Sequence, residues 1–159
     1  MPPESHQEEL AVRLRGLVPT PSGSGVFLEA DDKVIAIFID SSVAASIGLY
    51  LQGIEKPRPF THDLIGNMLS GFGITVLKVV VNDLIEDTFY ARILLKQQNE
   101  LGTNLLEVDA RPSDAMAIAL QQDAPIFVVR KVMEAADDMA WALDEATEVD
   151  PDIDVGGDV

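Results

Sequence analysis

The chain has 159 residues, no cysteine and a formal net charge of −16, and 47% of its residues are hydrophobic. This length suits one domain with enough apolar residues for a core. Without cysteine, the chain has no disulfide framework, no thiolate metal site and no cysteine nucleophile. No apolar run approaches the roughly 18 residues of a membrane span. The polar N-terminus lacks the features of a signal peptide, so we expect a cytoplasmic protein.

The charge is distributed unevenly along the chain. Ten of the 27 acidic residues follow Lys131, the last basic residue. Such a segment buries little surface, and we expect residues 136–159 to form an acidic tail, helical at first and then disordered. We also expect a flexible arm over residues 1–8 and one domain over residues 9–135. That domain is still acidic, which is unusual for a nucleic-acid binder, because Lys and Arg drive phosphate binding.

The first forty residues are typical of antiparallel strands. Residues 11–18 alternate weakly between apolar and polar side chains, and a turn-rich loop is expected at 19–25. Short apolar runs at 26–29 and 34–39 are separated by a polar turn, which predicts a hairpin. Together these segments predict an N-terminal β-meander.

Two helices are expected next. Asp40 or Ser41 is a suitable N-cap for the first helix, and Thr61 is a suitable N-cap for the second, which ends near Gly71. Between them, prolines hold the linker extended. Apolar residues recur at helical spacing along one side of each helix. They are Val43, Ala44, Ile47 and Leu51 in the first helix, and Leu64, Ile65, Met68, Leu69 and Phe72 in the second.

The middle of the chain predicts an antiparallel hairpin. Residues 74–81 form an apolar, β-branched run that is typical of a strand. A loop is expected at 82–87. Residues 88–96 then alternate well between apolar and polar side chains, which indicates a half-buried strand.

The C-terminal third predicts a strand, a helix, a strand and a last helix. The first strand covers residues 105–108, its helix ends at Gln122, and the second strand covers residues 126–129. The last helix is expected from Lys131 towards Leu143. Because hairpins dominate, we predict an α+β fold of mostly antiparallel strands, an N-terminal meander plus central hairpins, packed with three to four helices.

The polar junction between the strand at 105–108 and its helix is the most informative segment. It reads Asp109-Ala110-Arg111-Pro112-Ser113-Asp114-Ala115. One interpretation is structural, because Pro112 suits a first helical turn and Ser113 or Asp114 can accept from free amides there. The other is functional: Asp109 and Asp114 would bind a hard cation such as Mg²⁺ or Mn²⁺ through oxygen, and Arg111 would hold a phosphate.

A second polar run, Thr61-His62-Asp63, precedes the second helix. His62 is the only histidine outside the N-terminal arm, which makes it the candidate general base; the alternative is a polar first helical turn. Asp63 is a further candidate metal ligand, although adjacent helical residues do not face one another. Four residues are candidate substrate contacts through a guanidinium or a hydroxyl: Arg58, Thr61, Arg92 and Ser113.

Both polar runs resemble the bifunctional nuclease domain family. The resemblance rests on residues 109–115, on Arg-Pro-Phe-Thr-His-Asp-Leu-Ile at 58–65 and on Pro-Ile-Phe-Val at 125–128, and it spans residues 9–135. Some plant members are credited with cleaving both RNA and DNA. The resemblance therefore implies a metal-assisted nuclease. Its implied catalytic residues are His62, Asp109, Arg111 and Asp114, and its implied metal ligands are Asp63, Asp109 and Asp114.

The chain departs from this family at the start of the first helix. Many members carry Gly-Arg-x-Glu-Ala there, whereas residues 40–45 read Asp-Ser-Ser-Val-Ala-Ala. Two hypotheses follow: a phosphodiesterase acting on RNA and DNA, or a non-catalytic binding or regulatory domain for a protein partner or a small anionic ligand. Exposed sheet edges in a short domain also predict a homo-oligomer, most simply a dimer.

Overall fold

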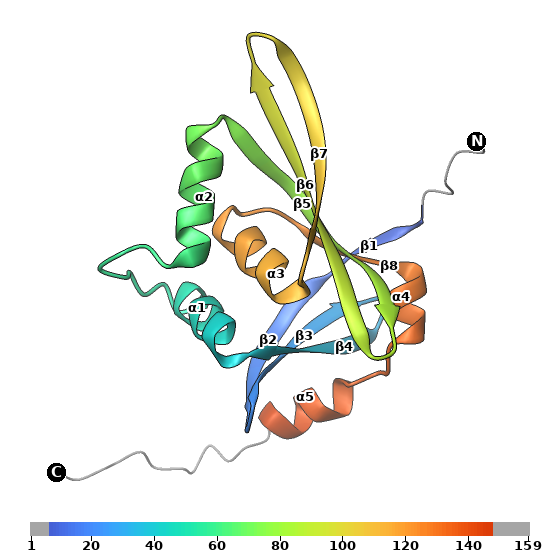
Figure 1. Ribbon diagram of the computed structural model, residues 1–159. Coiled ribbons are helices and arrows are strands. Elements are labelled where there is room, and N and C mark those ends of the chain that lie inside the picture. Colours follow the sequence, from blue (N-terminus) through green and yellow to red (C-terminus); the bar gives the residue numbers. More distant parts are fainter. Residues whose placement is uncertain (1–6, 148–159) are drawn as a thin grey trace, which may run out of the picture.

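The computed structural model describes residues 7–147 (Figure 1). Its strands are β1 (Glu9–Ala11), β2 (Arg13–Thr20), β3 (Gly23–Ala30), β4 (Lys33–Asp40), β5 (Ile74–Ile85), β6 (Thr88–Asn99), β7 (Gly102–Ala110) and β8 (Ile126–Val129). Its helices are α1 (Ser41–Leu51), α2 (Thr61–Gly71), α3 (Pro112–Gln121), α4 (Arg130–Ala135) and α5 (Ala140–Thr147). The strands form a five-stranded sheet, ordered β1-β8-β5-β6-β7, and a three-stranded sheet, ordered β2-β3-β4. The predicted α+β class is confirmed.

The three-stranded sheet is the predicted meander. Its β3–β4 turn consists of Asp31 and Asp32, both with positive φ, as a tight hairpin turn requires. The loop expected at 19–25 is shorter than predicted, a tight turn at Pro21 and Ser22, because β2 continues to Thr20 and β3 begins at Gly23. Gly23 pairs with Asp40, and a Cβ at Gly23 would lie only 2.1 Å from the carbonyl oxygen of Ile39. The absence of a side chain at Gly23 lets the end of β4 come close.

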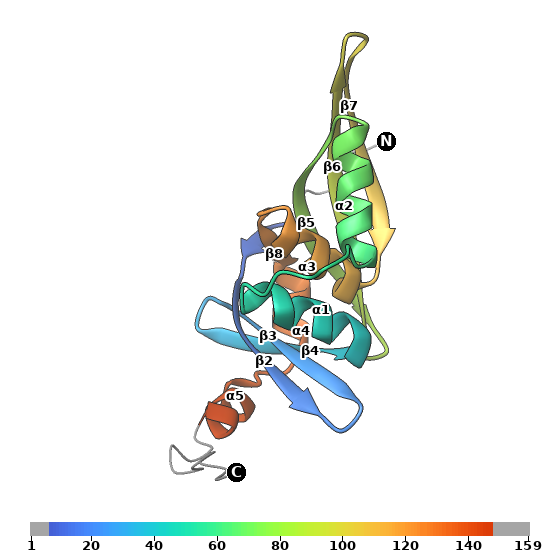
Figure 2. The same cartoon turned by 90° about the vertical axis from the view of Figure 1, so that its left-hand side faces the viewer.

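The five-stranded sheet contains the predicted central hairpin. Glu86 and Asp87 alone form its turn, both with positive φ, so β5 extends through most of the loop expected at 82–87. All strand pairs of this sheet are antiparallel except β5 and β8. Figures 1 and 2 show the far ends of β6 and β7 projecting beyond the body, with α2 alongside β5.

Helix α3 is the central element of the molecule. Between Pro112 and Ala119 only Asp114 is not fully buried, and the small side chains there let α1, α2 and the strands pack closely around it. Met116 at its centre has no exposed surface. This packing fixes the polar start of α3 beside the starts of two other helices.

The second helix is less buried than its apolar stripe suggests. Ile65 and Leu69 pack against the core, whereas Leu64, Met68 and Phe72 are exposed. The helix also starts one residue earlier than expected, with Phe60 rather than Thr61 as its N-cap. The carboxylate of Asp63 accepts the Phe60 N–H at 2.8 Å, as an acid at the third helical position does in a capping box, while Phe60 has no side-chain acceptor for the first helical N–H groups.

The C-terminal segment is folded further than expected. The single helix predicted from Lys131 is two helices, because residues 136–139 break it. The N–H of Met139 donates to the carbonyl of Val34 at 2.7 Å, and Leu143 packs with Phe27 and Ala36 on the outer face of the three-stranded sheet. The folded body thus continues to residue 147. Most of the predicted arm (1–6) and the end of the predicted tail (148–159) lie outside the described residues.

Between residues 7 and 147 there is no helix with the length and apolar character needed to cross a bilayer.

Candidate functional site

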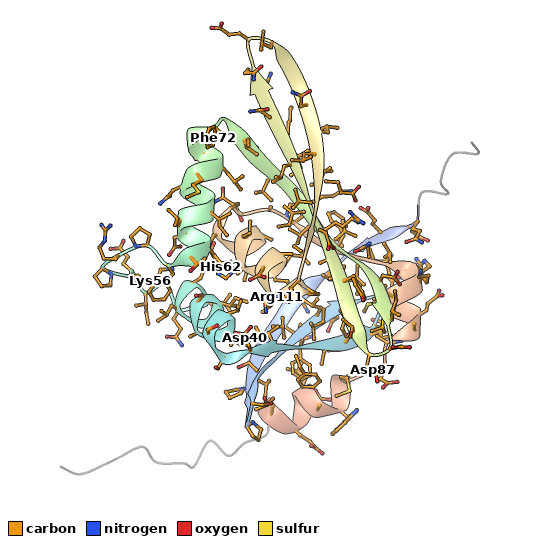
Figure 3. The ribbon with its side chains drawn as sticks, in the orientation of Figure 1. Asp40, Lys56, His62, Phe72, Asp87 and Arg111 are labelled. Carbon is orange, nitrogen blue, oxygen red and sulfur yellow. The ribbon has the colours of Figure 1, made fainter. Side chains whose placement is uncertain are left out.

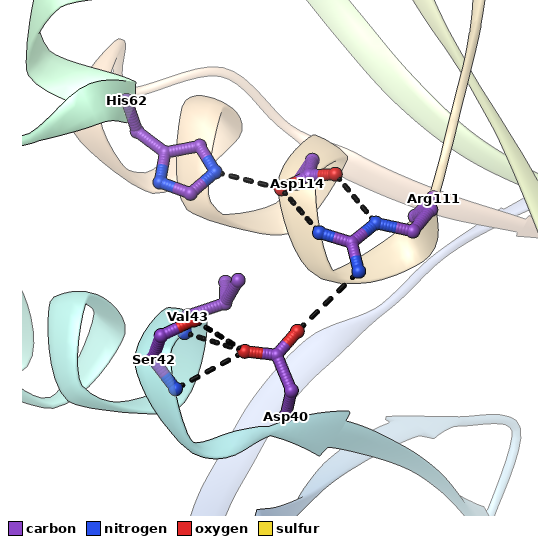
Figure 4. A network of polar contacts seen from close by, with 6 residues as sticks. All are labelled: Asp40, Ser42, Val43, His62, Arg111 and Asp114. Atoms are coloured by element: carbon purple, nitrogen blue, oxygen red, sulfur yellow. Dashed lines mark hydrogen bonds and ion pairs between the residues drawn. The ribbon is translucent and has the colours of Figure 1, made fainter.

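Three helix N-termini meet at the candidate site (Figure 3). His62 of α2 contacts Asp114 of α3, and Arg111, the N-cap of α3, contacts Asp40, the N-cap of α1. These two contacts tie together the starts of α1, α2 and α3 (Figure 4). Because helix N-termini carry partial positive charge and free N–H groups, their meeting point favours an anion.

His62 and Asp114 form a charge-assisted pair. The Nε2 atom of His62 lies 2.8 Å from Oδ1 of Asp114, and His62 is buried. Partial burial opposes ionisation of Asp114, but hydrogen bonds from Arg111 and His62 outweigh it and lower the pKa of the carboxyl. An ionised carboxylate only accepts hydrogen bonds, so Nε2 carries the proton. Neutral His62 then has its free lone pair on Nδ1.

The Nδ1 atom of His62 has no hydrogen-bond partner within residues 7–147. The sole fully buried side-chain nitrogen or oxygen atom without a partner in that range is Oδ1 of Asn82, so Nδ1 keeps access to solvent. Figure 4 shows Nδ1 directed away from Asp114. His62 lines a pocket of about 400 Å³ between the starts of α1 and α2. The other lining residues are Ser42, Val43, Ser46, Pro59, Phe60 and Thr61.

Arg111 joins the two ends of this network. Its Nε and Nη2 atoms donate to the carboxylate of Asp114 at 2.9 and 3.2 Å, and its Nη1 donates to Oδ2 of Asp40 at 3.4 Å. The bond to Asp114 raises the pKa of Arg111. Its side chain is nonetheless 64% exposed. The guanidinium is therefore held in one orientation while an anion can still reach it.

Asp40 is a member of this network that the sequence did not reveal. The prediction that Asp40 or Ser41 caps α1 is confirmed for Asp40, whose Oδ1 accepts from the backbone N–H groups of Ser42 and Val43 at 3.1 Å each. Hydrogen bonds from the Ser42 hydroxyl and the Val43 N–H lower the pKa of its carboxyl. Its other oxygen faces Arg111, which is 71 positions away in sequence. A cap is visible in the sequence, but such a distant partner is not.

The other predicted acidic residues lie apart from this network. Asp109 is exposed on β7, in register with Arg92, and its side chain forms no hydrogen bond or ion pair with another described residue. Asp63 accepts from Lys56 at 2.7 Å. Burial opposes its ionisation, but the bonds from Lys56 and the Phe60 N–H outweigh it and lower the pKa of Asp63.

The predicted substrate contacts are divided between the pocket and the surface. Thr61 lines the pocket, and Ser113 is buried in the first turn of α3. Arg92 lies 4.0 Å from Glu107 on the neighbouring strand. Arg58 is exposed in the linker between α1 and α2. The structure therefore brings together His62, Arg111 and Asp114, with Thr61 beside them.

The three candidate metal ligands do not form one cluster. Asp63 is bound by Lys56, Asp114 is bound by Arg111 and His62, and Asp109 stands on a different strand. Among the residues described, no group of three or more histidine, aspartate or glutamate side chains is arranged to hold a metal ion. The arrangement does not fit a metal site built from these three carboxylates, and Mg²⁺ or Mn²⁺ binding stays a prediction.

Comparisons with known proteins agree with the resemblance seen in the polar runs. The chain is 40% identical over 129 residues to an uncharacterized protein of Mycobacterium tuberculosis strain H37Rv, which covers 79% of this chain and 74% of that protein. It is 28% identical over 122 residues to bifunctional nuclease 1 of Oryza sativa subsp. japonica, and equally to a bifunctional nuclease of Oryza minuta. These matches cover 76% of this chain and 36% of each rice protein. The family model of the bifunctional nuclease domain matches residues 26–140, and the chain belongs to that family.

Proposed function

We propose that the chain binds phosphodiesters of RNA and DNA where α1, α2 and α3 begin, and that it hydrolyses them with His62 as the general base. One observation carries the proposal: Nε2 of His62 is held by Asp114 while Nδ1 is directed away from Asp114 and has no partner among residues 7–147, and His62 lines the pocket. A base needs a free lone pair on the substrate side and a fixed orientation, and this pair supplies both.

The proposed reaction uses only groups of this chain and one water molecule. The water gives a proton to Nδ1 of His62 as its oxygen forms a bond to phosphorus and the bond to the leaving oxygen breaks. Asp114 stabilises the imidazolium, which then returns its proton to the leaving oxygen. Arg111 stabilises the charge that develops on the phosphate. The hydroxyl of Thr61 lies in the same pocket and can orient the substrate.

The names of the rice relatives support nuclease chemistry, and this chain corresponds to about a third of their length.

The proposal also includes a cytoplasmic location and a homodimer. A dimer is supported by two exposed apolar surfaces: Leu105 and Leu106 on the edge strand β7, and the outer face of α2, where Phe72 is 72% exposed. Size-exclusion chromatography with light scattering tests it, and a mass of 17.2 kDa would contradict it.

Ion pairing favours the alternative of a binding domain for a small anionic ligand. In the part of the chain that the structure describes, every basic side chain except Lys33, Arg58 and Lys96 lies within 4.0 Å of a carboxylate oxygen. A long nucleic acid needs many free cations along its backbone, whereas a small anion needs only a few donors. Binding without cleavage is therefore the second candidate function.

Cleavage of labelled single-stranded RNA and DNA by the full chain separates these functions. Wild-type protein is compared in Mg²⁺, Mn²⁺ or EDTA with Asp114→Asn and with its matched control, Asp109→Asn. We expect cleavage by the wild type and by Asp109→Asn, and its loss in Asp114→Asn. Equal rates for all three proteins would show that cleavage does not take place at the network around Asp114. If folded wild-type protein cleaves neither substrate under any of these conditions, the nuclease proposal is contradicted, and binding without cleavage is the function that remains.

A further inference from the structure

We propose that the carboxylate of Asp40 occupies an anion-binding site, formed by the start of α1 and Arg111, and that a phosphate group binds there by displacing it. In the resting protein, Asp40 thereby restrains binding at this site. This inference rests on the proposed function, because it assigns the place of a substrate phosphate and names the group that regulates access to it.

The donors around Asp40 are those that hold phosphates in proteins. Its Oδ1 accepts from the N–H groups of Ser42 and Val43 at 3.1 Å and from the Ser42 hydroxyl at 2.6 Å, and its Oδ2 accepts from Arg111 Nη1 at 3.4 Å. Backbone amides of a helix start, a hydroxyl and a guanidinium thus converge on one negatively charged group (Figure 4). A phosphate could accept from the same four donors.

Two further polar groups of the adjoining pocket are available to a ligand. Ser46 lies one helical turn after Ser42 and lines the same pocket; it is 7% exposed, and its hydroxyl has no partner within residues 7–147. Nδ1 of His62, equally buried as a residue, is also without a partner there. The sole fully buried side-chain nitrogen or oxygen without a partner in that range is Oδ1 of Asn82, so both of these groups can be reached from the pocket. A ligand there can accept from the Ser46 hydroxyl and donate to Nδ1.

The exposure of the pair allows the exchange. The Asp40 side chain is 45% exposed and that of Arg111 is 64% exposed, so the carboxylate can turn into solvent without crossing the core. A phosphate that enters would satisfy the N–H groups of α1 that Asp40 leaves. With Asp40 in place, however, its charge repels the incoming anion at short range. At about 6 Å in water, that repulsion corresponds to about tenfold in affinity for a doubly charged phosphate.

The substitution Asp40→Asn separates the charge from the cap. Asparagine keeps an oxygen that can accept from Ser42 and Val43, and Asp40→Ser serves as a second variant that also preserves a cap. Asp87→Asn is the matched control, because it removes the same charge from an exposed turn whose positive φ asparagine tolerates. The double variant Asp40→Asn with Arg111→Gln removes the guanidinium donor.

The test measures binding by the full chain with two probes. Inorganic phosphate is titrated while the amide resonances of Ser42 and Val43 are followed by NMR, and a labelled single-stranded oligonucleotide is titrated by fluorescence anisotropy. We expect Asp40→Asn to bind about tenfold more tightly than wild type, Asp87→Asn to bind like wild type, and the double variant to lose the gain. A gain with both probes identifies nucleic acid as the source of the phosphate. A gain with phosphate alone identifies a free phosphate.

Unchanged binding of both probes by Asp40→Asn and Asp40→Ser would overturn the inference. An equal gain in affinity in Asp87→Asn would also overturn it, because the gain would then come from the lower net negative charge of the protein and not from the site at Asp40. Failure of the proposed function looks different: Asp40→Asn would gain affinity while neither it nor the wild type cleaves. Conversely, cleavage that depends on Arg111, with no gain in binding affinity in Asp40→Asn, would support the proposed function and contradict the anion site at Asp40.

Discussion

The Nε2 atom of His62 lies 2.8 Å from Oδ1 of Asp114, although the two residues are 52 positions apart in sequence. This contact gives Asp114 a role that its place in the 109–115 run does not suggest. Its carboxylate accepts a hydrogen bond from the His62 imidazole, which orients the ring, and it also accepts two hydrogen bonds from Arg111. The pair thus connects the start of α2 with the start of α3, and it leaves the second imidazole nitrogen, Nδ1, without a partner among the described residues.

Replacing Asp114 should affect stability as well as chemistry. In Asp114→Asn, His62 and Arg111 lose their charged acceptor, and we expect the free energy of unfolding to fall by about 1 kcal/mol, since the carboxylate is partly exposed and solvent screens it. Urea unfolding of the full chain measures this. Asp109→Asn, on the exposed strand β7, should stay within about 0.5 kcal/mol of wild type. Equal losses in both variants would contradict the network.

The same carboxyl should make stability depend on pH. In the folded protein the pKa of Asp114 is below its ordinary value of 3.8, so the unfolded chain binds this proton first as pH falls. The stabilisation is fully present above the ordinary value and is lost as pH falls through the folded-state pKa. Between pH 6 and 3, the urea midpoint of Asp114→Asn should therefore fall less steeply than that of wild type. Parallel curves would show that Asp114 has the same pKa in both states.

Gly23 should not tolerate a side chain. A Cβ there would meet the carbonyl oxygen of Ile39 at 2.1 Å, and this oxygen belongs to the backbone of β4, just before Asp40. We expect Gly23→Ala to destabilise the protein by about 1–3 kcal/mol, as overpacking does. Gly71→Ala is the control, because nothing lies within 4 Å of its added Cβ. Thermal unfolding should separate the two, and a native-like Gly23→Ala would mean that β3 and β4 are less closely paired.

Helix α5 should contribute to the stability of the folded body. Leu143 is buried against the three-stranded sheet, whereas Trp141 of the same helix is 59% exposed. Leu143→Ala is expected to lower the free energy of unfolding by about 2–3 kcal/mol, and Trp141→Ala should change it little. Chemical denaturation of both variants checks this. Similar small effects would place α5 outside the cooperative unit.

Elements with strong local patterns were predictable from the sequence. The strand at 126–129 was placed with its observed bounds, and the cap of α1 was found, because periodicity and capping depend on neighbouring residues. The loops expected at 19–25 and 82–87 do contain the two tight turns, but they were predicted too long, because their outer residues also tolerate strand conformations. The break at 136–139 was missed because its apolar residues also suit a continuous helix. There, tertiary contacts such as that of Met139 with Val34 decide the path.

The candidate site was predictable only in part. Polar residues at the start of a helix mark a possible site, and His62, Arg111 and Asp114 do come together. The sequence could not separate Asp109 from Asp114, which are five positions apart but belong to a strand and a helix. Nor could it show that Asp40 and Arg111 face one another, since that contact depends on how α1 and α3 pack. Long-range pairing is the part of the site that local patterns do not encode.

Chemical rescue of His62→Ala is the most direct test of the central claim. Cleavage of labelled single-stranded RNA is measured for wild type, His62→Ala and His6→Ala, which removes the chain's other histidine, with and without added imidazole. Loss of a general base should slow His62→Ala by about 10²–10⁴-fold, and imidazole entering the pocket should restore part of the rate; His6→Ala should match wild type. Cleavage by folded His62→Ala at the wild-type rate would contradict the assignment of His62 as the base.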